Sequence, residues 1–376
     1  MHKPTCKILV AYHKLDRLIE DDVYTPIHVG RAIFQQKSKD GVISTADTQA
    51  LLSSMIGDDT GENISEDNRF FNEMTALFWA WKNYDKLGNP DYVGLSHYRR
   101  HFVFNEKAPL PYKNWLPECQ TFMFEGLFED YLNLVDSSHC LKLITRYDCL
   151  TTYEYDTKKQ NPNREYKTLK DRYCELSQLD GALYDVMKNF IVQNYPNYKE
   201  DIELFEKRTD HHLFNMFVMR KDIFFEYCQL IFPTLFEIKR HLVKSNLNFS
   251  QMRAPGFLAE FITSIFIRHC ERLNIAKTKN LNVLFLDNVV GSLQELREEG
   301  AVYFKNLLRS RYLKCKYLLL RNQKDKEESL RLKLKVKRFE SMIKFMPENE
   351  RPSFYVQRDY QSKKIVLLHT VIWKRS

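Results

Sequence analysis

Short apolar runs alternate with amphipathic stretches along the first three quarters of the chain. Residues 6–12 (CKILVAY) form an apolar run bounded by polar residues, which is the pattern of a buried strand. The runs 27–29, 91–95 and 214–219 have the same character and similar lengths. The pattern therefore predicts four short buried strands.

Amphipathic helices are predicted between and after these runs. Residues 68–84 place apolar side chains at helical spacing, at Phe70, Met74, Leu77, Phe78 and Trp81. Helical spacing returns in four later stretches: 176–193, the second half of 212–242, 256–274 and 302–320. A strand, a helix and a second strand in succession are typical of α/β proteins, because parallel strands need helical crossovers. We therefore expect an α/β fold.

Other stretches show neither of these patterns clearly or depart from them. Residues 35–68 and 153–173 are rich in polar and turn-forming residues, and we expect loops there. Residues 330–337 (LRLKLKVK) alternate strictly. This alternation favours a strand that carries Arg331, Lys333, Lys335 and Lys337 on one face, with the apolar runs near 354–359 and 364–373 as pairing partners.

The stretch DYVGLSHYRRHF, residues 91–102, carries an unusual group of side chains. A short buried strand ends in His97, Tyr98, Arg99, Arg100 and His101. In open α/β sheets, ligands bind beyond the carboxyl ends of the strands, which is where this group falls. The two arginines are permanently charged donors suited to phosphate oxygens, and a surface ion pair is the alternative.

Charge is unevenly distributed along the 376 residues. The formal net charge is +8, yet residues 301–376 hold 20 Lys and Arg against 7 Asp and Glu, whereas the remainder holds 37 against 42. We therefore expect a main domain of residues 1–300 and a basic C-terminal extension of residues 301–376. Such asymmetry indicates an anionic partner for the extension.

Several classes of protein are disfavoured by what the sequence lacks. No window approaches the 18–20 apolar residues of a transmembrane helix, and the first residues lack the pattern of a signal peptide. The eight cysteines stand apart, without a C-x-x-C pair, which favours free thiols in a reducing cytoplasm. Neither a Walker A loop nor a G-x-G-x-x-G motif is present.

Four acidic residues in three parts of the chain are candidates for chemistry. Asp58 and Asp59 lie in GDDTGEN, either as metal or donor ligands or as solvated acids of a tight turn. Asp210 precedes two histidines, although neighbouring side chains of an extended chain point apart. Glu260 lies inside an apolar helix, where a carboxylate is costly unless it is paired, used or turned to solvent.

Seven stretches, in this order, resemble a family of bacterial proteins with a domain of unknown function, DUF4422. They are ILVAYHK, PIHVGRA, GDDTGENIS, NEMTALFWAWKN, DYVGLSHYRRHF, NMFVMRKDIFFEYCQLIFPTLFEI and GFLAEFI, and the likeness covers about residues 6–290. Members occur among glycosyltransferases of capsule, exopolysaccharide and O-antigen, and some are described as galactofuranosyltransferases. Pro255 and Phe261 depart from the usual form of the last block, whereas Glu260 keeps it.

The resemblance implies a GT-A-like fold, a nucleotide-sugar-binding sheet flanked by helices. It implies Glu260 as the catalytic base, with Asp210 as second choice. GT-A strands that hold a metal end in Asp-x-Asp, but the corresponding strand here ends in SHYRR. We therefore expect arginine to replace the metal at the donor diphosphate, with Mg²⁺ or Mn²⁺ near GDDTGEN as the alternative. The implied donor-binding residues are Ala11, Tyr12, His13, Lys14, His28, Asp58, Asp59, His97, Tyr98, Arg99 and Arg100.

The predicted function is transfer of a sugar, galactofuranose by resemblance, from a UDP-sugar to a lipid-linked surface-polysaccharide acceptor. UDP-galactopyranose and UDP-glucose are alternative donors. A non-catalytic protein whose tail binds nucleic acid or another polyanion is the rival class, disfavoured because no nucleic-acid motif is present. The expected location is the cytoplasmic face of the membrane, with residues 301–376 on anionic lipid and apolar side chains of 302–320 in the interface.

Overall fold

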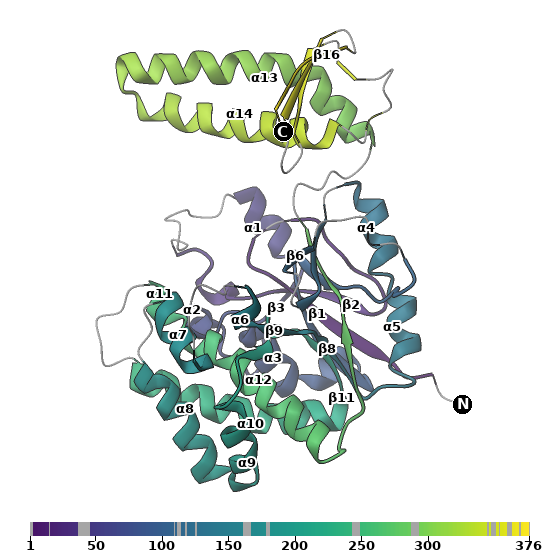
Figure 1. Ribbon diagram of the computed structural model, residues 1–376, viewed down its shortest axis with the longest axis vertical. Coiled ribbons are helices and arrows are strands. Elements are labelled where there is room, and N and C mark those ends of the chain that lie inside the picture. Colours follow the sequence, from purple (N-terminus) through teal and green to yellow (C-terminus); the bar gives the residue numbers. More distant parts are fainter. Residues whose placement is uncertain are drawn as a thin grey trace. The chain divides into compact units, whose positions relative to one another are not determined.

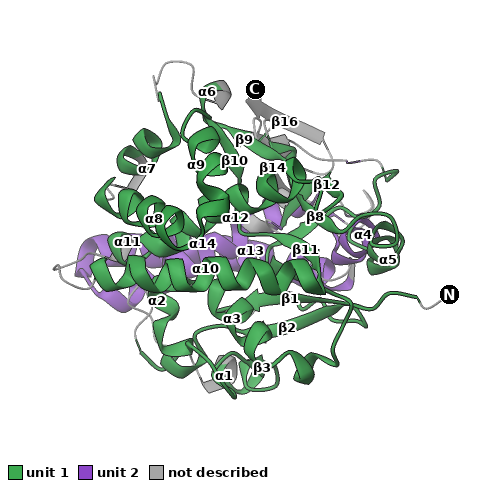
Figure 2. Ribbon diagram, turned by 90° about the horizontal axis from the view of Figure 1, so that it is seen from below, with its two compact units in different colours: residues 1–108, 114–122, 135–285 green, residues 109–113, 123–134, 286–376 purple. Residues whose placement is uncertain are grey.

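The computed structural model describes most of the chain and divides it into two compact units. The described residues are 3–14, 16–36, 46–108, 110, 114–116, 119–124, 126–160, 167–177, 181–242, 249–286, 293–343, 346, 351–352, 354–358, 363–367 and 370–375. Unit 1 comprises residues 1–108, 114–122 and 135–285, and unit 2 comprises 109–113, 123–134 and 286–376 (Figure 2). The sequence boundary at residue 300 stays a prediction.

A mixed sheet forms the centre of unit 1 (Figure 1). Its neighbouring strands, in order, are β3 (Ile56–Gly57), β2 (Tyr24–His28), β1 (Cys6–Tyr12), β4 (Tyr92–His97), β11 (Phe217–Arg220), β8 (Cys149–Thr152) and β12 (Thr278–Leu281). Strands β3, β2, β1 and β4 are parallel, and β11 runs antiparallel between β4 and β8. The predicted α/β fold class is thus confirmed, and each of the four predicted strands overlaps an observed one.

The sheet continues from the carboxyl end of β4 through a tight turn. Strand β5 (Arg100–Phe102) folds back so that His97 pairs with Arg100. It then pairs with β13 (Val283–Leu286), which neighbours β7 (Thr121–Phe124) and β6 (Asn114–Leu116). The stretch 96–101 therefore joins two parts of one sheet instead of ending in a surface loop.

Helices cover the sheet and close a large apolar core. Leu9 and Leu95 of the central strands are buried against α3 (Met74–Lys82), α8 (Gly181–Asn194), α10 (Lys221–Leu242) and α12 (Ala254–Arg272). Other short helices are α1 (Ala46–Leu52), α2 (Asn68–Phe71), α4 (Phe128–Leu134), α5 (Ser137–Leu143), α6 (Thr157–Gln160), α7 (Leu169–Ser177), α9 (Lys199–Phe205) and α11 (Phe249–Met252). The 3₁₀ turns are Arg31–Ile33, Ser65–Asp67, Tyr84–Leu87 and Pro196–Tyr198.

The predicted helix over 68–84 is interrupted. Asn72 has a φ of 50°, which ends α2 and lets α3 begin afresh behind Glu73. The Asn72 side chain lies close to Gly256, since a Cβ on Gly256 would lie 2.1 Å from Asn72 Nδ2. Arg253 Nε also donates to Asn72 Oδ1 at 3.1 Å. The break is thus fixed by α12.

Two stretches predicted as loops contain regular structure. Residues 35–68 include α1 and β3, and residues 153–173 include β9 (Glu154–Asp156), which pairs with β10 (Asp210–His212), and the start of α7. These helices and strands are short, so neither the helical nor the alternating pattern of apolar residues extends far enough to be recognised in the sequence. The parts of these predictions on residues 37–45 and 161–166 lie outside the described residues.

Unit 2 contains a helical hairpin and a small sheet. Helices α13 (Leu293–Leu320) and α14 (Gln323–Met342) pack along each other (Figure 1), and β14 (Phe354–Arg358), β15 (Lys363–Leu367) and β16 (Thr370–Arg375) form an antiparallel sheet. The strand predicted over 330–337 is wrong, because these residues lie within α14. Arg331, Lys333, Lys335 and Lys337 consequently do not share one face.

Candidate functional site

The carboxyl ends of three parallel strands meet at one edge of the sheet in unit 1. Ala11 pairs with His97 and Tyr12 pairs with His28 in the strand register. The turn after β4 is anchored there, because Tyr98 N donates to Ala11 O at 3.2 Å. Strands β1, β2 and β4 thus bring predicted donor-binding residues from three parts of the chain to one place.

Two guanidinium groups lie in the β4–β5 turn. The Arg99 guanidinium carbon stands 5.1 Å from the centre of the Phe285 ring, and that of Arg100 stands 4.7 Å from the Phe214 ring. Within the described parts of the chain, the buried Nε atoms of both arginines have no hydrogen-bond partner. Burial, together with the charge of Arg99, lowers the pKa of Arg100. Unpaired donors held on aromatic faces are prepared to bind an anion.

A strained turn before β11 binds three polar side chains of the candidate site. Phe214 and Asn215 both have positive φ, at 76° and 51°, a conformation that non-glycine residues adopt at a cost. Phe214 N donates to Glu260 Oε1 at 2.9 Å, while Phe214 O accepts from His97 Nε2 at 2.8 Å. Asn215 Nδ2 donates to Glu73 Oε1 at 2.8 Å. Two consecutive residues therefore position one histidine and two carboxylates.

The Glu260 carboxyl has an unusual acidity. Its pKa is raised to about 7, mainly by burial and also by the nearby charge of Glu73, against the opposing hydrogen bond from Phe214. Arg172 and Arg100 act in the lowering direction. Burial also lowers the pKa of His97, whose Nε2 lies 3.9 Å from Glu73 Oε1. A carboxyl with a pKa near neutrality can accept a proton at physiological pH.

Asp210 is in a different environment. Its carboxylate accepts from Arg208 Nε at 2.7 Å and from Arg268 Nη2 at 3.1 Å. Burial would raise the pKa of Asp210, but the hydrogen bond and charge of Arg208 and the charge of Arg268 outweigh it and lower the pKa. An acid with a lowered pKa is a weak base, so the geometry favours Glu260 for proton transfer.

The two histidines after Asp210 are also engaged. His211 Nδ1 donates to His212 O at 2.8 Å, and its Nε2 accepts from Arg172 Nη1 at 2.7 Å. Burial lowers the pKa of His211 to about 3. His212 Nδ1 donates to Thr152 O at 2.8 Å. These contacts connect β10 to its neighbours and leave the rings neutral.

The predicted donor-binding residues of β1 and β2 differ in accessibility. His13 and Lys14 are exposed beside the Tyr98 ring, whose centre lies 5.0 Å from that of His13 and 5.7 Å from Lys14 Nζ. Tyr12 is buried, and its hydroxyl donates to Arg17 O at 2.9 Å. Ala11 is buried too. His28 packs edge-on to Phe34, and burial lowers its pKa to about 4.

Asp58 connects several elements of the scaffold through hydrogen bonds. Its buried carboxylate accepts from the backbone N–H groups of Gly30 and Arg31 and from the hydroxyls of Ser65 and Thr75. It thereby connects the turn after β2 to the 3₁₀ turn Ser65–Asp67 and to α3. Asp59 instead accepts from Arg31 Nε at 2.7 Å and is partly exposed. This geometry places Asp58 in the scaffold beneath the sheet edge.

Metal ligands are not clustered in the described part of the chain, where no group of three His, Cys, Asp or Glu side chains could hold an ion. Asp58 has its oxygens occupied by four internal donors, and Asp59 is paired with Arg31. The GDDTGEN segment is therefore not arranged as a cation cage. The cationic side chains at the edge include Arg99, Arg100 and Lys14.

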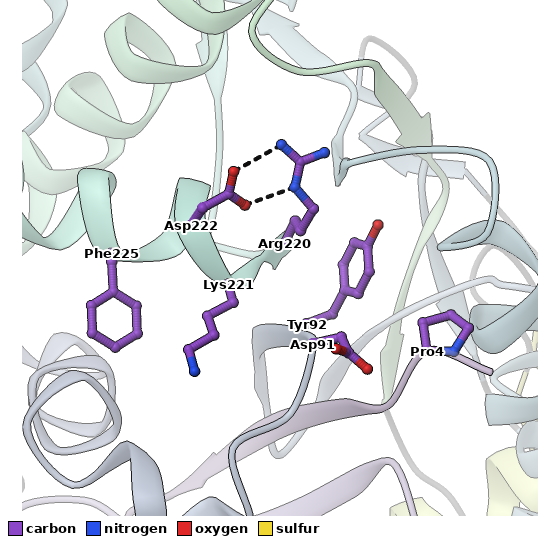
Figure 3. A pocket seen from close by; sticks show the side chains of 7 residues that line it. All are labelled: Pro4, Asp91, Tyr92, Arg220, Lys221, Asp222 and Phe225. Atoms are coloured by element: carbon purple, nitrogen blue, oxygen red, sulfur yellow. Dashed lines mark hydrogen bonds and ion pairs between the residues drawn. The ribbon is translucent and has the colours of Figure 1, made fainter. Parts of the chain in front are cut away.

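A separate pocket of about 490 Å³ opens at the opposite edge of the sheet (Figure 3). Pro4, Asp91, Tyr92, Arg220, Lys221, Asp222 and Phe225 line it. Tyr92 begins β4 whereas His97 ends it, a separation of roughly 15–20 Å along an extended strand. Arg220 is bound to Asp148 and Asp222. Four of the seven lining residues are charged, and none of the predicted site residues lines this pocket.

The fold and its edge define an α/β protein similar to a glycosyltransferase structure. The chain matches the solved apo structure of WbbM, a bifunctional glycosyltransferase, with 28% identity and a TM-score of 0.64 over 75% of this chain and 45% of that one. It thus spans less than half the length of that enzyme. The chain belongs to the family described as domain of unknown function DUF4422, whose model matches residues 7–272. No curated protein matches it.

Sequence reasoning missed the residues that organise the site. Glu73 lies in the NEMTALFWAWKN block, but it reads there as an ordinary polar position of a helix. Phe214 and Asn215 read as part of a strand, whereas their backbone forms the strained turn before β11. Because the predicted helix ran through residues 68–84, no local signal set Glu73 apart from the other polar positions of that helix.

The contrast between Asp58 and Asp59 gives a stability test. Asp58→Ala leaves two backbone N–H groups and two hydroxyls without their acceptor. We therefore expect the free energy of unfolding to fall by about 3–5 kcal/mol. Asp59→Ala breaks one partly exposed ion pair and should lower the free energy of unfolding by about 1 kcal/mol or less. Denaturant unfolding of both variants measures the difference. Equal losses would contradict the structural role of Asp58.

Proposed function

We propose that this protein is a glycosyltransferase that moves a sugar from a nucleotide-sugar donor to an acceptor hydroxyl. The observation that carries the proposal is the pair Arg99 and Arg100, whose buried Nε atoms have no hydrogen-bond partner among the described residues, beside a carboxyl with a pKa near 7 at the ligand edge of the sheet. The similarity to a glycosyltransferase structure at 28% identity supports the same reaction class.

The arginines bind the donor diphosphate. A guanidinium pair presents several N–H donors to phosphate oxygens and keeps its charge at any physiological pH. As the bond between the anomeric carbon and the diphosphate oxygen breaks, negative charge accumulates on the leaving group, and fixed cations stabilise it. His13, Lys14 and Tyr98 lie at the same edge and contribute the remaining walls of the donor site.

Glu260 is the general base. The acceptor oxygen forms a bond to the anomeric carbon, the bond to the nucleoside diphosphate breaks, and the hydroxyl proton passes to the Glu260 carboxylate. Phe214 N–H fixes Oε1 of that carboxylate at 2.9 Å. Glu73 and His97 are positioning residues, because Asn215 and Phe214 hold both beside Glu260.

The donor is a UDP-sugar, with galactofuranose as the transferred unit, and the acceptor is a lipid-linked intermediate of a surface polysaccharide. The sequence blocks shared with galactofuranosyltransferase-like proteins support this specificity. UDP-galactopyranose and UDP-glucose are the competing donors. A thermal-shift screen against nucleotides and nucleotide sugars separates them, because a ligand that binds only the folded state raises the melting temperature.

The arginines should control donor affinity. Arg99→Ala or Arg100→Ala should weaken UDP binding by about 1.5–3 kcal/mol, the range of a charge-assisted hydrogen bond. Arg146→Ala is the matched control, since Arg146 is an exposed arginine beside Tyr147 in unit 1. Isothermal titration with UDP measures the affinities. Folded variants at positions 99 and 100 that bind UDP like the control would refute the donor site.

Glu260 should control turnover and leave donor affinity almost intact. Glu260→Gln keeps an oxygen for the Phe214 N–H but cannot accept a proton, so we expect kcat to fall about 100-fold or more. Asp210→Asn should retain most of the turnover if its ion pairs with Arg208 and Arg268 are structural. Steady-state kinetics with UDP-release detection compare the two. Near-normal turnover of the Gln variant would remove Glu260 from catalysis.

The acidity of Glu260 predicts a pH profile. Because the base must be ionised, kcat/KM should fall as the pH drops below about 7, the raised pKa of Glu260. Glu73→Gln removes a like charge that raises this pKa, so the acidic limb should move to lower pH. Rates measured from pH 5 to 9 test the shift. An unchanged limb, or one moved upward, would contradict the coupling between the two carboxyls.

A further inference from the structure

The outward face of α13 in unit 2 carries an apolar stripe. Phe304, Leu308, Tyr312 and Leu319 follow one another at helical spacing, and their side chains are between 51% and 82% exposed. The exposed Cys315 falls on the same line. Isolated exposed apolar residues are ordinary, but a continuous stripe of large ones indicates an interaction surface.

The stripe is not the face that packs against α14. Tyr303 and Ser310 of α13 are buried against that helix, where Tyr303 Oη donates to Glu340 Oε1 at 3.0 Å and Ser329 Oγ donates to Ser310 O at 2.7 Å. Residues 304, 308 and 312 lie on the opposite side of the helical circumference from 303 and 310. The buried core of the hairpin therefore excludes the stripe, although Leu308 and Tyr312 border a groove that Asp325 and Glu328 of α14 also line.

Cationic residues border the stripe on both sides. Lys305 and Lys316 lie along one border, and Arg311 lies along the other, by their positions on the helical circumference. Lys316 also pairs with Asp325 at 3.1 Å. Residues 301–376 hold 20 Lys and Arg against 7 Asp and Glu. The surface thus combines an apolar centre with a cationic rim.

We propose that α13 lies in the plane of an anionic lipid surface, with this stripe inserted among the acyl chains and the bordering cations at the headgroups. An amphipathic helix with an apolar face and a cationic border binds in this way. No described helix is long and apolar enough to cross a membrane, so the geometry fits a helix that lies along the surface. The proposal concerns the surface of unit 2 and does not depend on the transfer reaction.

The distribution of charge disfavours two other partners for the stripe, a second copy of the chain and the chain's own residues 1–300. A second copy of the hairpin would bring together two surfaces that each carry an excess of cations, even though Lys316 and Arg309 are paired with Asp325 and Glu328, and this costs free energy. Residues 1–300 hold only a small excess of acidic groups, 42 against 37 basic ones, spread over a long stretch of chain. Anionic phospholipid offers a dense negative surface and an apolar layer beneath it, and it matches both features.

The test uses the full chain and two matched variants. Leu308→Glu with Tyr312→Glu places two charges in the stripe, whereas Leu204→Glu places one at a comparably exposed leucine of α9 in unit 1. Binding is measured by co-sedimentation with phosphatidylglycerol–phosphatidylcholine vesicles and with phosphatidylcholine vesicles, at low and high salt. We expect the wild type and Leu204→Glu to bind the anionic vesicles in a salt-sensitive way, and the stripe variant to bind them at least ~10-fold more weakly.

Every other result counts against the proposal. Equal binding to both vesicle types, no binding by the wild type, or unchanged binding by the stripe variant would overturn it. Analytical ultracentrifugation tests a second copy: a wild-type dimer that the stripe substitutions dissociate assigns the stripe to self-association. Thermal unfolding tests the rest of the chain, since a much lower melting temperature for the stripe variant than for Leu204→Glu would place the stripe in an internal interface. No donor or acceptor is needed, so these outcomes leave the proposed transfer reaction untouched.

Discussion

The candidate site depends on one short piece of strained backbone, the turn at Phe214 and Asn215. Its N–H, its carbonyl and one amide side chain reach Glu260, His97 and Glu73, which come from three separate elements. Both residues have positive φ, a conformation that costs on the order of 1–3 kcal/mol each. The surrounding sheet and helices must supply that free energy. The strained turn thus lowers the stability of the fold somewhat, and it fixes the distances between two carboxyls and a histidine.

The sequence predicted the sheet edge better than it predicted the site. Residues 91–102 were placed correctly at the carboxyl end of a strand, because a buried strand and its end are local patterns. Glu73 was not identified, because its role depends on the helix break at Asn72, which Arg253 and Gly256 of a distant helix fix. Likewise, nothing local distinguishes Asp58 from Asp59, although one is enclosed by four donors and the other is paired near the surface.

Residues 330–337 show how an alternating pattern can mislead. Leu330, Leu332, Leu334 and Val336 alternate with cations, which predicted a strand, yet they lie in α14. Leu332, Val336 and Phe339 are buried at helical spacing, whereas Leu330 and Leu334 are exposed. The helical period was present but was hidden by the exposed leucines. Exposed apolar residues such as Leu330 and Leu334 therefore hide the helical spacing of the buried ones, on which the sequence-based prediction depends.

The cationic pair of the β4–β5 turn has a kinetic consequence. Arg99 and Arg100 are covalent parts of the chain, so unlike a bound ion they cannot depart together with a product. A nucleoside diphosphate released by transfer carries more negative charge than the same group within a sugar donor, and the same guanidiniums attract it at least as strongly. For the proposed donor site, we therefore expect the released nucleoside diphosphate to act as a product inhibitor. Its release would then contribute to the overall rate of the catalytic cycle.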